Sequence, residues 1–187
     1  MSSWCLVITG PPCSGKSYLA CQLAKRLKLP CLSKDGLKET LFDTLGWDDP
    51  LLAERYNAAA YELLYHVLDT LMPAGNTLMV ESNFRPEMAS QRLERLAAAH
   101  SYQVLQVVCS APPEVLLQRF RARWAAGERH PGHGDDAKTD RIAESLAGQR
   151  YGPLHLPGPV IRVDTTDLHQ VDVDVVLAQI ATLTGLS

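Results

Sequence analysis

The chain has 187 residues, of which 46% are hydrophobic and 21% are charged, and these values are typical of a single globular domain over residues 1–187. The formal net charge of −3 excludes the overall basic character of a protein dedicated to duplex DNA. No stretch approaches eighteen uninterrupted apolar residues, and no charged leader precedes a cleavable apolar segment, so we expect a cytoplasmic protein that does not bind membranes.

Strand-like and helix-like segments alternate along the whole chain. Short apolar runs predict strands at 4–9, 30–33, 76–81, 102–109 and 159–164. Apolar residues at helical spacing predict helices at 16–28, 35–45, 51–72, 86–99, 112–126 and 171–184. Five apolar strands separated by helices predict a parallel sheet that helices cover on both faces.

The junction between the first strand and the first helix reads GPPCSGKS over residues 10–17, which we call the phosphate loop. It matches the pattern G-x-x-x-x-G-K-[ST] in the strand–loop–helix context that this pattern requires. Two glycines let backbone N–H groups point inward, and the helix adds its N-terminal amides, so the loop can cradle phosphates. A plain glycine turn is the alternative. The residues expected to contact ATP here are Gly10, Pro11, Pro12, Cys13, Ser14, Gly15, Lys16, Ser17 and Tyr18.

Polar residues directly after the predicted strands are further candidates, because ligands of parallel α/β sheets bind beyond the carboxyl ends of the strands. Asp35 follows the second strand, where a carboxylate either caps the next helix or accepts the proton of an acceptor hydroxyl. Glu81 ends the third strand, and it either holds Mg²⁺ together with Ser17 or forms a salt bridge at the sheet edge. Asn83 and Arg85 are candidate acceptor contacts.

Residues 127–140 contain three glycines, a proline and almost no apolar side chain, which predicts a mobile, exposed loop within a lid segment at about 112–148. Arg119 and Arg123 share one face of the preceding helix. They are predicted to close over the transferring phosphate, and a solvated helix surface is the alternative. His130 and His133 form a poor metal ligand set, because zinc sites usually need three or four donors.

Taken together, these motifs resemble those of P-loop kinases of the adenylate-kinase-like group, especially the polynucleotide kinase, chloramphenicol phosphotransferase and zeta-toxin kinases. The resemblance implies a three-layer α/β/α P-loop NTPase fold with a five-stranded parallel sheet and a mobile lid. It implies a general base at Asp35 in SKDGLKE and an acidic residue at Glu81 in ESNFRPE. The sequence QRFRAR resembles the lid arginines and assigns that role to Arg119 and Arg123. Lys38 stands where polynucleotide kinases carry an arginine.

The combined hypothesis is a kinase that moves the γ-phosphoryl group of ATP to a hydroxyl of a small-molecule or nucleotide-like acceptor, with Mg²⁺. A polynucleotide 5′-hydroxyl kinase and a non-catalytic, ATP-dependent regulatory binding module are the alternatives. Arg119 is expected to contact ATP, and Ser17 and Glu81 to bind the metal. The residues expected to be catalytic are Lys16, Asp35, Glu81, Arg119 and Arg123.

Overall fold

The computed structural model of the chain describes residues 3–134, 139–147 and 150–186. At its centre lies a five-stranded sheet with the strand order β2-β3-β1-β4-β5, and every neighbouring pair of strands is parallel. The strands are β1 (Trp4–Thr9), β2 (Cys31–Ser33), β3 (Leu78–Glu81), β4 (Gln103–Ser110) and β5 (Val160–Asp164). The expected parallel sheet is therefore confirmed.

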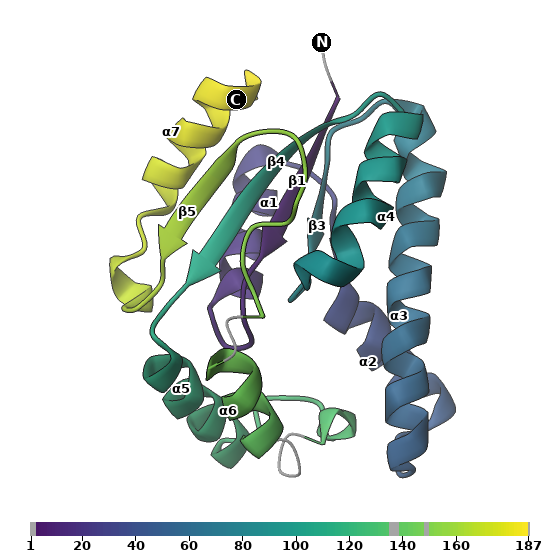
Figure 1. The fold of residues 1–187 in the computed structure, drawn as a ribbon, viewed down its shortest axis with the longest axis vertical. Coiled ribbons are helices and arrows are strands. Elements are labelled where there is room, and N and C mark those ends of the chain that lie inside the picture. Colours follow the sequence, from purple (N-terminus) through teal and green to yellow (C-terminus); the bar gives the residue numbers. More distant parts are fainter. Residues whose placement is uncertain (1–2, 135–138, 148–149, 187) are drawn as a thin grey trace.

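Helices cover both faces of this sheet, which confirms the three-layer fold class (Figure 1). The α-helices are α1 (Lys16–Leu27), α2 (Lys34–Leu45), α3 (Pro50–Leu71), α4 (Pro86–Ala99), α5 (Pro113–Ala125), α6 (Thr139–Ala147) and α7 (Val173–Thr184). Short 3₁₀ helices are η1 (Met72–Ala74), η2 (Pro131–His133) and η4 (Leu168–Gln170). Among the helices of the described ranges, none is both long and apolar enough to cross a membrane.

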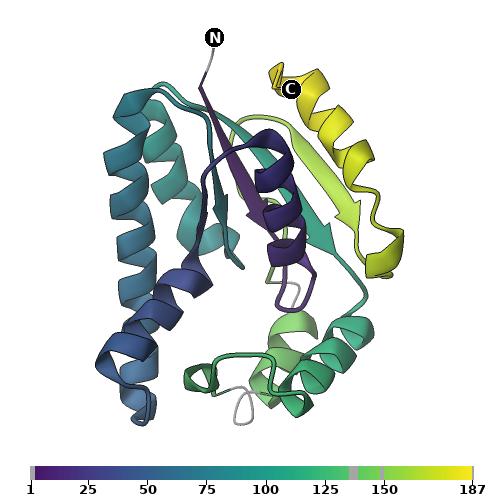
Figure 2. The ribbon, with the colours of Figure 1, turned by 180° about the vertical axis from the view of Figure 1, so that it is seen from behind.

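The two faces of the sheet form separate cores. Successive residues of β1 point to opposite faces, as strand geometry requires. Cys5 and Val7 pack in one cluster with buried side chains of α3 and α4. Leu6 and Ile8 pack in a second cluster with side chains of α1 and α7, which lie together on the other face (Figure 2). Because both faces are covered, the central strands are mostly apolar, and Gln106 in β4 is a buried polar exception.

Part of the sheet is covered by an extended segment, residues 150–158, instead of a helix. Gln106 lies inside β4, and its side-chain amide donates to the Leu154 carbonyl at 3.1 Å and accepts from the Leu154 N–H at 2.7 Å. The N–H of His155 donates to the Ser90 hydroxyl of α4 at 2.9 Å. These bonds satisfy backbone groups that a helix would have satisfied internally.

The carboxyl ends of all five strands meet at one edge of the sheet, and α2, α5 and α6 lie beyond that edge (Figure 1). The predicted strands and helices are confirmed with boundary differences of no more than two residues. The prediction of an exposed loop at 127–140 is confirmed at Gly127, Glu128 and Pro131. It was wrong at Gly132 and His133, which are buried, and at Thr139, where α6 begins. Residues 135–138 of that loop lie outside the described ranges.

Candidate active site

The phosphate loop has a backbone that only glycine allows at two positions. Gly10 has φ +150°, and a Cβ there would lie 2.4 Å from the Cys109 carbonyl oxygen. Gly15 precedes α1 with φ +77°, and a Cβ there would lie 2.4 Å from the Leu168 side chain. Cys13 also has a positive φ of 63°. The chain thus wraps tightly at the N-terminus of α1, as an anion-binding loop must.

The side chains of the phosphate loop and of Tyr18, which follows it, differ in exposure. Pro12 and Ser14 are buried, Pro11 is partly buried, and Tyr18 is 56% exposed. Among the described residues, the buried Ser14 hydroxyl has no hydrogen-bond partner. A buried hydroxyl without a partner is costly, so this site favours a polar ligand. Lys16, the first residue of α1, is only 8% exposed.

Glu81, at the end of β3, joins three elements. Its Oε1 accepts from the Ser17 hydroxyl at 3.1 Å and lies 3.9 Å from the Lys16 ammonium. Its Oε2 accepts from the Ser33 hydroxyl at the end of β2, at 2.8 Å. The structure therefore brings together the two residues expected to bind Mg²⁺. Carboxylate and hydroxyl oxygens at this separation fit a Mg²⁺ ion, which takes oxygen ligands at about 2.0–2.1 Å.

Asp35 lies in the first turn of α2 but does not cap it. Ser33 is the N-cap, and its hydroxyl accepts from the Gly36 N–H at 3.4 Å, so the capping alternative for Asp35 was wrong. The Asp35 carboxylate lies 2.6 Å from the Lys34 ammonium and 2.8 Å from the Arg129 guanidinium. Burial alone would raise the pKa of this carboxyl, but the two cations outweigh it and hold the pKa well below its usual range.

His133 fixes the lid segment to α2. Its ring meets the buried Phe42 ring edge-on, with centroids 5.3 Å apart, and its Nε2 lies 2.9 Å from Glu39. Burial and the neighbouring Arg129 lower the pKa of His133 to about 2, so the ring is neutral and Nε2 donates to the Glu39 carboxylate.

His130 makes a second set of contacts with α2. Its ring stacks on Phe42 with centroids 5.0 Å apart, and its Nδ1 accepts from the Gly132 N–H at 3.0 Å. That bond leaves Nε2 to donate to the Asp43 carboxylate at 3.0 Å. Among the described residues, no group of three or more His, Cys, Asp or Glu side chains is placed to hold a metal ion.

The two arginines of α5 meet different surroundings, although they lie one turn apart. Arg119 donates to the Thr166 carbonyl at 2.9 Å, in the segment after β5 that also contains Leu168. Arg123 lies with its guanidinium carbon 5.9 Å from the centre of the Phe120 ring and lines a cavity. Arg119 therefore contacts the segment after β5, whose Leu168 side chain lies against Gly15 of the phosphate loop, and Arg123 lines the cavity.

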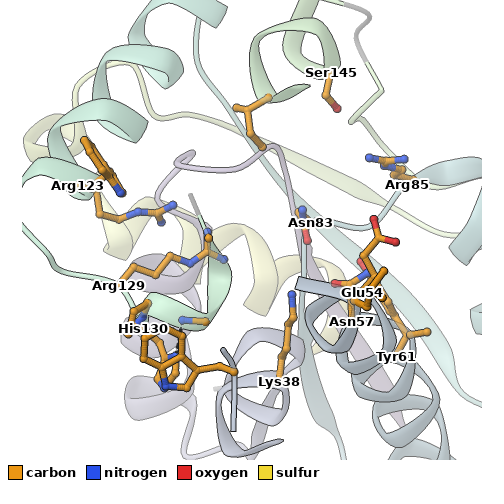
Figure 3. A pocket seen from close by; sticks show the side chains of 18 of the residues that line it. Lys38, Glu54, Asn57, Tyr61, Asn83, Arg85, Arg123, Arg129, His130 and Ser145 are labelled. Atoms are coloured by element: carbon orange, nitrogen blue, oxygen red, sulfur yellow. Dashed lines mark hydrogen bonds between the residues drawn. The ribbon is translucent and has the colours of Figure 1, made fainter. Parts of the chain in front are cut away.

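That cavity has a volume of about 1470 Å³ and lies between α2, α3, the residues after β3 and the lid segment (Figure 3). The phosphate loop does not contribute to its lining. The sequence pointed to Asn83 and Arg85, which line this cavity. It did not point to Lys34 and Arg129, which are the partners of Asp35. Its labelled polar lining residues are Lys38, Glu54, Asn57, Tyr61, Asn83, Arg85, Arg123, Arg129, His130 and Ser145.

Comparisons with known proteins agree with this geometry. The model of a family described as an AAA domain (AAA_33) matches residues 6–149. The crystal structure of a "putative kinase" from Chloroflexus aurantiacus J-10-fl is similar, with a TM-score of 0.88 and 37% sequence identity over 97% of this chain and 98% of the other. No curated protein matches the sequence.

More distant similarity extends to two further kinase structures. A gluconokinase from Sinorhizobium meliloti 1021 has a TM-score of 0.60 and 14% identity, over 98% of this chain and 94% of its own. A shikimate kinase from Bacteroides thetaiotaomicron has a TM-score of 0.59 and 20% identity, over 98% of this chain and 99% of its own. At these identities the similarity shows the fold alone. The chain belongs to the AAA domain family AAA_33 and has the fold of the P-loop kinases.

Proposed function

We propose that this protein is a kinase that transfers the γ-phosphoryl group of ATP to a hydroxyl of a small-molecule acceptor. The observation that carries the proposal is the contact between Glu81 and Ser17 of the phosphate loop, together with a large cavity whose wall includes Asn83, two residues after Glu81. The cavity is bounded by α3 on one side and by the lid segment on the other, which favours a small acceptor over a polynucleotide. The whole chain, 1–187, would act as one kinase domain with its lid at about 112–148.

The nucleotide would bind at the phosphate loop. Backbone N–H groups of residues 10–17 and the Lys16 ammonium would bind the phosphates, and Arg119 would contact the nucleotide from α5. Ser17 and Glu81 would hold Mg²⁺, which supplies positive charge to the phosphates when it is bound. The hydrogen bonds of Glu81 to Ser17 and Ser33 keep its carboxylate oriented toward the loop.

The transfer step would depend on Asp35. The acceptor oxygen forms a bond to the γ-phosphorus, the bond from that phosphorus to the β–γ bridging oxygen breaks, and ADP leaves. The proton of the acceptor hydroxyl passes to the Asp35 carboxylate. Because Lys34 and Arg129 hold Asp35 ionised, its main contribution is to orient the hydroxyl, and the proton moves as the new bond forms. Arg123 would neutralise charge on the transferring group.

The test is the substitution Asp35→Asn, with Asp69→Asn as a matched control on the exposed side of α3. Calorimetry measures MgATP binding, and γ-labelled ATP with a mixed metabolite pool measures transfer. We expect Asp35→Asn to bind MgATP with nearly unchanged affinity and to transfer at least about 100-fold more slowly, as for loss of an acid–base group. Undiminished transfer would contradict the role of Asp35, and ATP binding by the unaltered protein without any labelled product would favour the regulatory module.

A further inference from the structure

The charged side chains that line the cavity, among the described residues, differ in exposure by sign. The cations are the less exposed: Lys38 is buried, and Arg85, Arg123 and Arg129 are partly buried. The acidic side chains are exposed, namely Asp48, Glu54 and Glu62. Figure 3 shows Arg123 and Arg129 on one side of the space, and Arg85 and Lys38 around Asn83 on the other. The less exposed charges of the described lining are therefore the positive ones.

Arg85 differs from the other three cations. Arg129 is bound to Asp35, Arg123 lies over an aromatic ring, and the Lys38 ammonium lies 5.1 Å from the centre of the Phe42 ring. The guanidinium of Arg85 makes no hydrogen bond or ion pair with any residue in the described ranges. A partly buried cation without a counterion is costly unless a ligand supplies one.

The backbone holds Arg85 in place. It is the N-cap residue of α4, with φ −100° and ψ 127°, and Pro86 after it restricts it to this extended conformation. Its carbonyl accepts from the N–H groups of Met88 and Ala89 at 3.0 and 2.9 Å. The side chain thus starts from a fixed point and extends into the cavity (Figure 3).

We propose that the acceptor carries an anionic group, a carboxylate or a phosphate, in addition to its hydroxyl, and that Arg85 binds this anion. The inference rests on the kinase function proposed above. A guanidinium presents parallel N–H donors that match two oxygens of a carboxylate or phosphate. Lys38 adds a second positive charge on the neighbouring wall. On the lid side, Arg123 is left to contact the transferring phosphoryl group, and Arg129 stays paired with Asp35.

The experiment compares matched sets of compounds as acceptors of label from γ-labelled ATP. Each set holds a neutral polyol, its carboxylate and its phosphate: glycerol, glycerate and glycerol 3-phosphate, then glucose, gluconate and glucose 6-phosphate, then ribose, ribonate and ribose 5-phosphate. We expect one anionic member to have a kcat/KM at least about 10-fold above that of its neutral counterpart, because one good ionic contact supplies that difference. The carboxylate and phosphate members show which anion is bound.

Arg85→Gln tests the assigned residue, and Arg95→Gln, an exposed position on the same helix, is the control with the same loss of charge. We expect Arg85→Gln to lower kcat/KM for the anionic acceptor about 30-fold or more and to leave the KM for ATP unchanged. Preference for a neutral compound, or an unaltered kcat/KM in Arg85→Gln, would overturn the inference and leave the kinase in place. If MgATP binds but no compound of either kind is labelled, the proposed function fails, and the inference fails with it.

Discussion

The contact of Gly132 with α2 predicts that one added methyl group would release the lid segment. A Cβ at Gly132 would lie 2.8 Å from Phe42 Cγ and 2.8 Å from Trp47 Cβ, whereas ordinary contacts begin at 3.4 Å. Phe42 is 1% exposed and cannot move aside, so residues 130–134 must shift by several tenths of an ångström. Overpacking of this kind costs about 1–3 kcal/mol, which makes opening of the segment about 5- to 150-fold more frequent.

Hydrogen exchange of Gly132→Ala measures this opening. The N–H of His133 donates to the His130 carbonyl at 3.1 Å, and the N–H of Gly134 to the Pro131 carbonyl at 2.9 Å. We expect both amides to exchange about 5- to 150-fold faster, with the amides of β1 and β4 unchanged. Gly152→Ala is the control, because a Cβ there meets nothing within 4 Å. Unchanged exchange at residues 133 and 134, or equal acceleration in the sheet, would refute the reasoning.

Three further predictions concern other parts of the structure. Glu81→Gln replaces one of the two oxygens that accept from Ser17 and Ser33 by an NH₂ donor and removes the negative charge. MgATP affinity in calorimetry should therefore fall at least about 10-fold, while the affinity for ATP in EDTA changes little. The pKa of His133 is about 2 in the folded protein against an ordinary 6.5, so only the unfolded chain takes up this proton as the pH falls below 6.5. The unfolding free energy of the unaltered protein should therefore fall with pH, and in His133→Gln this fall should be smaller by up to about 1.4 kcal/mol per pH unit. Urea titrations at pH 4–6.5 measure the difference. Gly158→Ala should lower the unfolding free energy by more than about 2 kcal/mol in thermal denaturation, because φ is +120° and the Cβ would lie 2.1 Å from the Val104 carbonyl oxygen.

Sequence patterns predicted the parts of the site that local residues define. The phosphate loop is visible because its glycines, Lys16 and Ser17 are consecutive and lie between a strand and a helix. Glu81 was predictable because strand ends in a parallel sheet meet at one edge, and the structure confirms that it contacts Ser17. The roles assigned to these residues stay predictions.

Contacts between distant segments were not predictable from the sequence. Asp35 and Arg129 are 94 positions apart, and so are Glu39 and His133. A loop rich in glycine and charge is usually exposed, and nothing in its composition shows that its two imidazole rings pack on Phe42. Helix α6 was missed, although Ile142 and Leu146 have the i, i+4 spacing of a helix face.

The bonds between Gln106 and Leu154 limit how α5 and α6 can move. The chain that contains the two helices leaves the sheet at Ser110, where β4 ends. It returns to the sheet at Leu154, whose backbone makes two hydrogen bonds with the Gln106 side chain of β4. A segment that is tied at both ends to one strand has fewer positions open to it than a segment tied at one end. If the lid segment closes as proposed above, this tie would lower the conformational entropy that closure costs.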